Sequence, residues 1–507
     1  MDLSLHPPSG STTSPVAARR AWADRLSPTA LLLVTTLLVR LPFLWHGFGV
    51  HPDEAGVLRS GIEMWLDGRF YISRPPGYPL NEFLMGGLAL LGGGPLCALA
   101  AAVASCVAVV ALERWLRAAG VRHAVWIALA FAVHPWLWRS STHALDYIWA
   151  MMSLCLAGRD IQTGRYRWGA LWCALGIGFR WSSVLWVGPL WAYAWYRQRS
   201  RREAALFAGV VAVVGTILLL PALLGTRHWA GEGGQYTFLT PTVRRLVLFG
   251  YHVVEFWGHV FGVVVIGVAW WLGRRQPSTP AAARPDWLPL HGAIVVLYVA
   301  LFWLHSDKCE YFLPVLPSAL FLMSRAISRR GWQAIALVFL FNGLVTLRVG
   351  HWPRSGVRFM APHFEAGAVL RDNQHRAETA ERVNAFWRGL QEPDATVVVP
   401  GLQVMEELNV FARLGASPAS RVRIEGWVVP GMYHLRGPDG CPCVEFWPVR
   451  RTGDEKSCWP VLIHPATGAV AVDGMCVTPA DQVARLTRQA YHHQASRDEV
   501  ATRWGKR

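Results

Sequence analysis

The sequence predicts an all-α polytopic membrane domain of about eleven transmembrane helices, followed by an extracytoplasmic α/β domain. Of its 507 residues, 53% are hydrophobic and only 16% are charged, whereas about 25% are charged in soluble chains. Apolar runs approaching the ~20 residues that cross a bilayer recur along the first two thirds of the chain. This composition excludes a soluble enzyme, a disordered chain and a coiled coil.

The predicted spans follow one another closely along residues 27–349. They lie near 27–46, 95–113, 123–138, 144–158, 168–180, 182–196, 204–223, 250–272, 288–304, 311–328 and 331–349. The third to sixth are short, so they pair as tight hairpins or extend into polar flanks. We interpret the first run as a retained anchor rather than a signal peptide, because no small-residue cleavage site follows it. Residues 1–26 are then a cytoplasmic tail.

The distribution of charge predicts the orientation. The formal net charge is +16, and residues 350–507 hold 19 basic and 17 acidic residues, so most of the excess lies in the apolar part. Arginines gather in every second connection, as in the positive-inside pattern, rather than on a face for nucleic acid. Arg makes up 46 of the 49 basic residues, which hints at a GC-rich bacterial genome. We therefore predict a bacterial inner-membrane protein with a cytoplasmic N-terminus and residues 350–507 outside.

In the outer segment 350–507, predicted strands and helices are interspersed, as in a small α/β module. A buried strand is expected near 395–400, further strands near 421–429, 443–449 and 459–464, and helices near 363–390, 402–414 and 479–494. Its four cysteines are Cys441, Cys443, Cys458 and Cys476. An oxidising compartment favours disulfides among them, although free thiols or a zinc site are alternatives.

The first outer loop, residues 46–94, carries the most informative motifs. His51-Pro52-Asp53-Glu54 comes first and Ser73-Arg74-Pro75-Pro76-Gly77-Tyr78-Pro79 follows. Pro52 suits the first turn of a helix and places Asp53 and Glu54 near its N-terminus. Coupling between the two carboxylates can give one of them the pKa of a general base. The alternative is that both are ordinary helix-start residues.

An Asp-Glu pair after the first span, an amphipathic helix and a Pro-Pro-Gly-Tyr-Pro stretch resemble the GT-C class of membrane glycosyltransferases. This class includes the protein O-mannosyltransferases, the aminoarabinose transferases and the GPI and dolichol-pathway mannosyltransferases. His51-Pro52-Asp53-Glu54 resembles the His-Pro-Asp-Glu of the GPI branch. The resemblance implies a sugar donor on a polyprenyl phosphate, Asp53 as catalytic base and Glu54 as its neighbour. His51, Arg74 and Tyr78 of the same loop become candidates for substrate binding.

Later segments add further candidates. Asp146 starts the fourth span on the outer side, where the class often has a second functional acid; a helix-start charge is the alternative. His305-Ser306-Asp307-Lys308-Cys309-Glu310-Tyr311-Phe312-Leu313-Pro314 resembles the His-Lys-Glu…Arg-Phe-Leu-Pro segment of the mannosyltransferase branch, without its Arg. It makes Lys308 and Glu310 substrate-binding candidates, although Lys308 could instead pair with Asp307 or Glu310.

Two more residues, Arg180 and His252, complete the set of substrate-binding candidates. Arg180 is a candidate for the donor phosphate, although outer arginines also anchor at the interface. His252 lies in Phe249-Gly250-Tyr251-His252, which loosely resembles a stretch of the same branch. With Glu255 and His259 it shares one helical face, which permits a metal site but favours packing.

Together these motifs predict an inverting membrane glycosyltransferase with Asp53 as base. Its partners are a polyprenyl-phosphate-linked sugar, a lipid, glycan or protein acceptor, and the membrane, with no nucleic acid. No cofactor is certain, and a divalent cation is possible. Two other functions are weighed against this one. A transporter or flippase for lipid-linked glycans would place acids in span centres, and a non-catalytic scaffold would use only the outer segment.

Overall fold

The computed structural model describes residues 28–45, 52–68, 77–198, 200–225, 242–274, 286–305, 308–351 and 358–377, with residues 70 and 73 and seven short strands between 396 and 477. The helical elements are α2 (Pro28–Leu38), η1 (Leu41–Phe43), α3 (Pro52–Asp67), α4 (Pro79–Ala118), α5 (Ala124–Ala132), α6 (Pro135–Ser140), α7 (Tyr147–Gln162), α8 (Tyr166–Phe179), η2 (Trp181–Ser183), α9 (Val184–Gln198), α10 (Arg201–Gly225), α12 (Thr242–Phe256), α13 (His259–Arg274), α14 (Leu288–Leu304), η5 (Cys309–Val315), α15 (Leu316–Met323) and α16 (Arg329–Leu344). Residues 368–377 are also helical.

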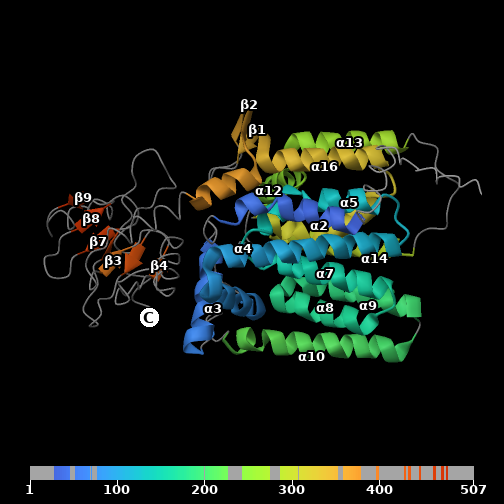
Figure 1. The fold of residues 1–507 in the computed structure, drawn as a ribbon, viewed down its shortest axis with the longest axis horizontal. Helices are drawn as coiled ribbons and strands as arrows, with labels where there is room; N and C mark the ends of the chain where they lie inside the picture. The colour runs from blue at the N-terminus through green and yellow to red at the C-terminus, as the bar shows by residue number, and fades with distance from the viewer. Residues whose placement is uncertain are drawn as a thin grey trace, which may run out of the picture.

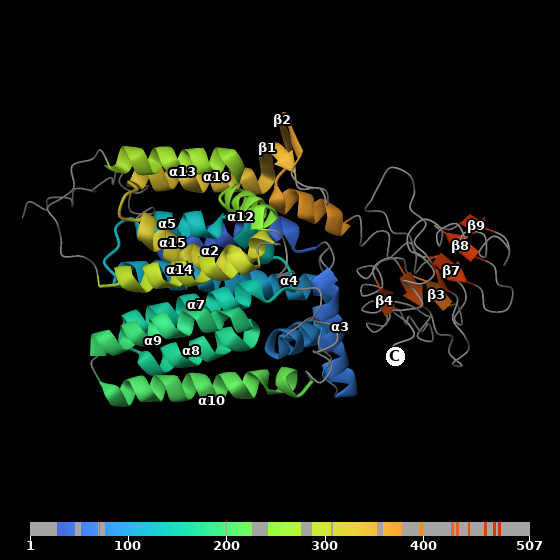
Figure 2. The same cartoon turned by 180° about the vertical axis from the view of Figure 1, so that it is seen from behind.

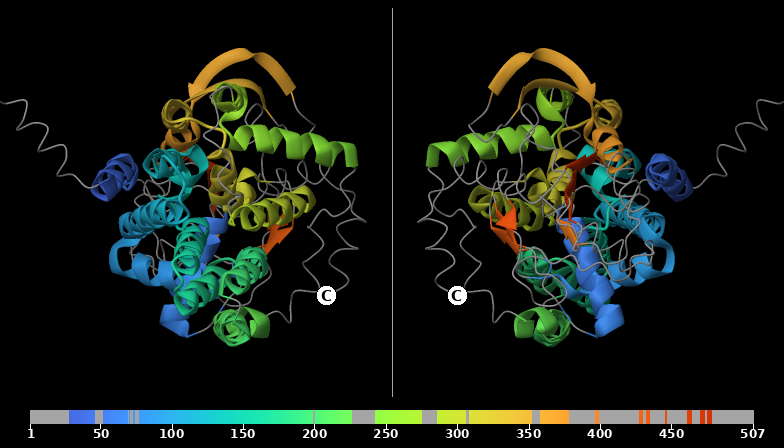
Figure 3. Two further views of the ribbon diagram at one scale, coloured as in Figure 1. Left: turned by 90° about the vertical axis from the view of Figure 1, so that its right-hand side faces the viewer. Right: turned by 90° about the vertical axis from the view of Figure 1, so that its left-hand side faces the viewer.

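Most of the long helices run side by side in one bundle, and α3 lies across one end of it (Figures 1 and 2). Seen end-on, α12 also lies across the bundle (Figure 3), because the chain bends by 69° between α12 and α13. Gly258 and His259 make this bend with positive φ angles of 87° and 58°. The predicted span 250–272 is therefore wrong as one straight helix.

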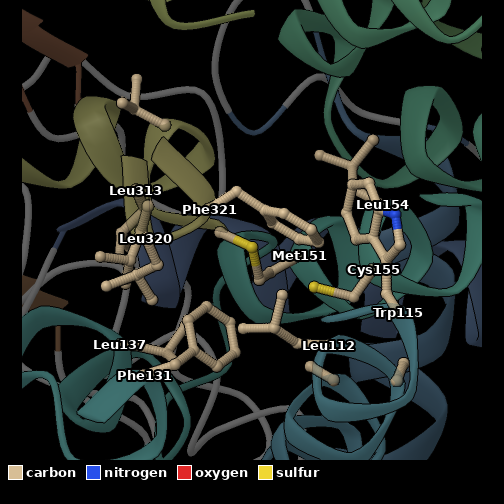
Figure 4. Close-up of a cluster of buried hydrophobic side chains, with 14 of the residues drawn as sticks. Leu112, Trp115, Phe131, Leu137, Met151, Leu154, Cys155, Leu313, Leu320 and Phe321 are labelled. Atoms are coloured by element: carbon tan, nitrogen blue, oxygen red, sulfur yellow. The ribbon is translucent and has the colours of Figure 1, made fainter. Parts of the chain in front are cut away.

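The bundle has a packed interior and an apolar exterior. Leu112, Trp115, Phe131 and Phe321 are buried in its centre (Figure 4). Along α10, by contrast, large apolar side chains face outward, with Ile217 at 61% and Leu224 at 70% exposure. An apolar outer surface on a helix of this length suits a bilayer rather than water. The bundle is thus built as a membrane domain.

Two helices, Pro79–Ala118 and Arg201–Leu224, are long and apolar enough to cross a membrane, and the bent α12–α13 pair would be a third. Shorter apolar helices cover Pro28–Phe43, Leu288–Leu304 and Cys309–Met323. Each of the eleven predicted ranges contains a helical segment. The number of helices that cross the membrane stays a prediction.

Helix α4 begins sixteen residues before the predicted span at 95, so the last third of the predicted loop 46–94 belongs to this helix. Pro79 occupies its first turn, where a missing amide proton costs nothing. The helix is kinked at Gly92 and Gly93, which have non-helical backbone angles. This kink lies directly before residue 95, where the predicted span begins.

A β-hairpin leaves the bundle at the end of α16. Strands β1 (Val345–His351) and β2 (Arg358–Ala366) pair antiparallel, as the arrows beside α16 show (Figure 1). The predicted span 331–349 is too long, because β-branched Val345 and Thr346 enter this hairpin instead of extending the helix. For the same reason, the predicted helix 363–390 is wrong at its start, where 363–366 belong to β2.

Short strands are described in the rest of the outer segment. β3 (Thr396–Val398), β7 (Val461–Ile463), β8 (Val470–Val472) and β9 (Met475–Val477) form an antiparallel sheet in the order β3-β7-β8-β9. β4 (Trp427–Val429), β5 (Met432–His434) and β6 (Glu445–Phe446) form another. β3, β4, β6 and β7 fall in the four predicted strand regions. The predicted helices 402–414 and 479–494 and the disulfides lie outside the described residues and side chains.

Ion pairs mark the two ends of the bundle. At one end, Arg197 binds Asp286 at 2.9 Å and Arg329 lies 5.6 Å from the ring of Trp126. At the other end, Lys308 binds Asp53 at 2.9 Å. Arg197 and Arg329, from two of the arginine-rich connections, therefore lie at the end opposite Asp53, in agreement with the alternation of charge. Which end faces the cytoplasm stays a prediction.

Candidate active site

Helix α3 carries Asp53 and Glu54 in its first turn, directly after Pro52. The helix dipole favours carboxylates at this position. Two glycines fix α3 against α4: a Cβ on Gly61 would lie 1.9 Å from the carbonyl oxygen of Glu82, and one on Gly86 would lie 2.1 Å from the carbonyl carbon of Gly61. The backbones therefore touch, and this contact holds the acidic turn of α3 over the end of the bundle.

Asp53 forms an ion pair with Lys308. Lys308 Nζ donates to Asp53 Oδ2 at 2.9 Å, and the side chains are 32% and 25% exposed, respectively. We call these two residues the open pair. The pair joins positions 255 residues apart in the sequence, so only the fold brings them together. It offers a carboxylate that can accept a proton beside a cation that can bind a phosphate.

Glu54, unlike the partly exposed Asp53, is buried, with an exposure of 1%. Its Oε1 contacts His143 Nδ1, and His143 Nε2 lies 2.6 Å from Asp372 Oδ2. Arg139 Nε donates to Asp372 Oδ1 at 2.9 Å, and Arg139 Nη1 donates to Glu310 Oε1 at 2.8 Å. With Arg376, which lies 3.2 Å from Asp372, these six residues form what we call the buried network.

The charges of the buried network support one another. Burial disfavours the charged form of His143, but Asp372 and Glu54 outweigh it and raise the pKa of His143. Burial likewise disfavours the ionised form of Asp372, yet His143 and Arg139 hold the pKa of that carboxyl well below its usual range. Protonated His143 and ionised Asp372 therefore stabilise each other.

Asp146 and Arg180 form a second ion pair nearby. Arg180 Nη1 donates to Asp146 Oδ2 at 2.5 Å, and both residues are buried. The guanidinium group lies 4.0 Å from the ring of Tyr147, 5.5 Å from that of Tyr311 and 5.9 Å from that of Tyr78. Sequence reasoning named Asp146, Arg180 and Tyr78 separately, and the structure brings them into one aromatic cage around a cation.

Glu82 organises the loop before α4. Its Oε1 accepts a hydrogen bond from the hydroxyl group of Ser73 and another from the backbone amide of Tyr78 at 3.4 Å. Glu82 is itself fully buried. One carboxylate thus contacts both Ser73 and the backbone of Tyr78, the residue that lies beside Arg180.

His252 lies on α12, close to the site but with a partner of its own. Its Nδ1 lies 2.9 Å from Glu255 Oε2, and its carbonyl oxygen is 3.6 Å from the thiol of Cys309. The prediction that His252, Glu255 and His259 share one helical face is wrong. Helix α12 ends at Phe256, and His259 begins α13 beyond the bend. Among the described residues, no group of three or more His, Cys, Asp or Glu side chains could hold a metal ion.

The structure thus gathers most of the predicted site residues at one end of the bundle. Asp53 and Lys308 form the open pair, Glu54 and Glu310 enter the buried network, and Asp146, Arg180 and Tyr78 share the aromatic cage. The interpretation of Lys308 as paired with Glu310 is replaced by its pairing with Asp53. His51 and the side chain of Arg74 lie outside the described residues.

Sequence reasoning missed Arg139, His143, Asp372 and Arg376. His143 stands three residues before Asp146 in a motif that was noticed for its acid alone. Asp372 and Arg376 have the i, i+4 spacing of a helical ion pair, a signal that is common on any exposed helix. Nothing in that spacing indicates that the pair is buried at the end of the bundle.

No family model matches the sequence, and no curated protein is significantly similar to it. Among solved structures, the chain is similar to the crystal structure of ArnT from Cupriavidus metallidurans bound to undecaprenyl phosphate, with a TM-score of 0.43 and 16% identity over 76% of this chain and 75% of that one. It is also similar to the S. cerevisiae protein O-mannosyltransferase Pmt1-Pmt2 complex bound to the sugar donor, with a TM-score of 0.31 and 17% identity over 40% of this chain and 33% of that one.

Protein O-mannosyltransferases are among the enzymes that the sequence motifs resemble. Because both TM-scores lie below 0.5, we carry no residue role and no substrate over from these alignments.

Proposed function

We propose that the protein is an integral membrane glycosyltransferase that moves a sugar from a polyprenyl-phosphate donor to an acceptor hydroxyl group, with inversion at the anomeric carbon. We place the reaction on the extracytoplasmic side of a bacterial inner membrane, in agreement with the charge alternation along the sequence. The acceptor is a lipid, a glycan or a protein. The motif resemblance and the geometry at the end of the bundle support this proposal independently of each other.

The observation that carries the proposal is the open pair. Asp53 and Lys308 are 2.9 Å apart and both remain partly exposed, whereas the neighbouring Glu54 is buried. A general base must reach the proton of its substrate, and Asp53 is the member of the Asp-Glu motif that has this access. Lys308 is partly exposed, so a phosphate can approach its side chain.

The proposed reaction uses both members of the open pair. The donor phosphate binds the Lys308 ammonium group and competes with Asp53 for it. Asp53 then accepts the proton of the acceptor hydroxyl group, whose oxygen forms a bond to the anomeric carbon. The bond between that carbon and the phosphate oxygen breaks, and the electron pair leaves with the polyprenyl phosphate. The phosphate is a good leaving group, so a single cation beside it supplies electrostatic stabilisation.

The aromatic cage has a supporting role in this proposal. Tyr78, Tyr147 and Tyr311 surround Arg180, whose charge is balanced by Asp146. Aromatic rings stack on sugar faces, so the cage is our candidate for the sugar end of the donor. His51, Arg74 and His252 stay candidates for substrate contacts around it. The described residues offer no group of three or more His, Cys, Asp or Glu side chains that could bind a metal ion, and we assign no step to one.

Purified full-length protein tests the proposal with a panel of polyprenyl-phosphate sugars and with detection of released polyprenyl phosphate. We expect release by the wild type and its loss in Asp53→Asn. The matched control is Glu63→Gln, which removes a carboxylate of the same helix that pairs with Arg59. A protein that binds donor but releases no polyprenyl phosphate with any acceptor extract would contradict a transferase and favour a transporter or a scaffold.

A further inference from the structure

The segment after the β-hairpin, residues 367–376, is fixed to the end of the bundle at several points. At its start, the amide of Gly367 donates to the carbonyl oxygen of Leu344 at 2.8 Å. At its end, Arg376 Nη1 donates to the carbonyl oxygen of Thr142 at 2.9 Å. Val369 is buried against Phe43 and Trp138 between these points. The segment is therefore packed as part of the bundle, although it follows the hairpin into the predicted outer domain.

This segment supplies Asp372 to the buried network. Asp372 is 4% exposed, and its two carboxylate oxygens bind Arg139 and His143. On the other side of the imidazole lies Glu54, one residue from Asp53 along the first turn of α3. A continuous line of polar contacts thus runs from residue 372 to the turn that carries Asp53.

We propose that residues 367–376 are a working part of the active site and that Asp372 is a positioning residue, which acts through His143 to hold Glu54 and with it the reactive turn of α3. This inference rests on the proposed function for its kinetic consequences. The contacts themselves do not depend on it.

The physical reason is that the contacts from Asp372 through His143 to Glu54 leave these side chains little freedom to move. A buried carboxylate without its partner is costly, so Glu54 cannot leave His143 easily, and His143 cannot turn while Asp372 and Glu54 bind both of its nitrogens. The turn of α3 that carries Asp53 is therefore fixed in direction. A reacting group that is misplaced by about 1 Å can lose up to about 100-fold in rate.

The test compares Asp372→Asn with Glu365→Gln in the full-length protein. Glu365 lies on β2 of the same hairpin and accepts from Arg348 at 2.7 Å and Arg371 at 3.0 Å, outside the buried network. We expect Asp372→Asn to lower kcat by about 10- to 100-fold with the donor KM within about twofold. We expect Asp372→Glu to recover part of the loss and Glu365→Gln to leave kcat unchanged. Full kcat in folded Asp372→Asn, or an equal loss in Glu365→Gln, would overturn the proposal.

A second measurement separates this inference from the proposed function. Thermal unfolding of His143→Gln, Asp372→Asn and the double variant forms a double-mutant cycle that needs no activity. We expect strong coupling, with the double variant less destabilised than the sum of the two single variants. If the wild type transfers no sugar but the cycle is coupled, the proposed function fails and the contact stands. If the two losses of stability simply add, Asp372 and His143 are not coupled, and the inference is wrong whether or not the protein transfers sugar.

Discussion

Asp53 and Glu54 are neighbours in one helical turn, yet they belong to regions of opposite character. Asp53 is partly exposed and pairs with Lys308, while Glu54 is buried in a network of six ionisable side chains. Both members of the open pair are partly exposed, so a substrate can approach them. The buried network holds four stretches of chain together: α3, residues 139–143, η5 and residues 367–376. Asp53 is therefore suited to react, and Glu54 is suited to fix the position of its neighbour.

The largest expected effect comes from removing the base. Asp53→Asn keeps the shape of the side chain but cannot accept a proton, so we expect the turnover of donor to fall by about 10²- to 10⁴-fold. Thermal stability should change little, because Asp53 is partly exposed. Steady-state transfer assays with a thermal melt of the same preparation measure both quantities. Near-wild-type turnover in Asp53→Asn would end the assignment of Asp53 as base.

The matched change on the buried side is Glu54→Gln. Removing one partner of a buried ion pair leaves the others uncompensated, and we expect a loss of about 3 kcal/mol or more in the free energy of unfolding. Activity should fall as a consequence of the displaced turn. Denaturant unfolding in detergent measures the first effect. A stable Glu54→Gln protein without activity would exchange the roles of the two carboxylates.

Lys308→Ala tests the cation of the open pair. We expect the donor KM to rise by about 10- to 100-fold, equivalent to about 1.5 to 3 kcal/mol, because a charge-assisted contact to phosphate is lost. Stability should change by less than about 1 kcal/mol, since both side chains are partly exposed. Lys308→Arg keeps the charge and serves as the control. An unchanged KM in Lys308→Ala would place the donor phosphate elsewhere.

The smallest expected effect is a pH dependence of stability. His143 has a raised pKa in the folded state because of Asp372 and Glu54, despite its burial. Its contribution to stability is complete below about pH 6.5, the usual value for histidine, and is lost as the pH rises through the folded pKa. Asp372 has a depressed pKa, so its own contribution is lost only at the acidic end, below about pH 4.

Thermal melts of the wild type and His143→Gln across the range from pH 6 to pH 9 check this sign. The difference in Tm between the two proteins should shrink by a few degrees as the pH rises. Arg139, Arg376 and Glu310 also face the network and are present in both proteins, so the comparison isolates the imidazole of His143. A difference that grows with pH would show that His143 is neutral in the folded protein.

Much of the helical architecture could be predicted from the sequence, because an apolar run of span length has few alternatives to a helix in a membrane. All eleven predicted ranges contain a helical segment. The errors occurred at Gly258 and at Val345, where local signals were stronger than the helical periodicity. In each case a residue with special backbone freedom or β-branching decided the outcome.

The acid at the start of α3 could also be predicted, because Pro52 followed by Asp53 and Glu54 is a local pattern. The buried network could not. His143, Asp372 and Arg139 come from separate parts of the chain, and Asp372 is joined to His143 across 229 positions. The sequence by itself determined a bundle of apolar helices with acids at one end and arginines at the other. Only the tertiary structure decided which acid is exposed, because burial depends on the β-hairpin that folds residues 367–376 back over the end of the bundle.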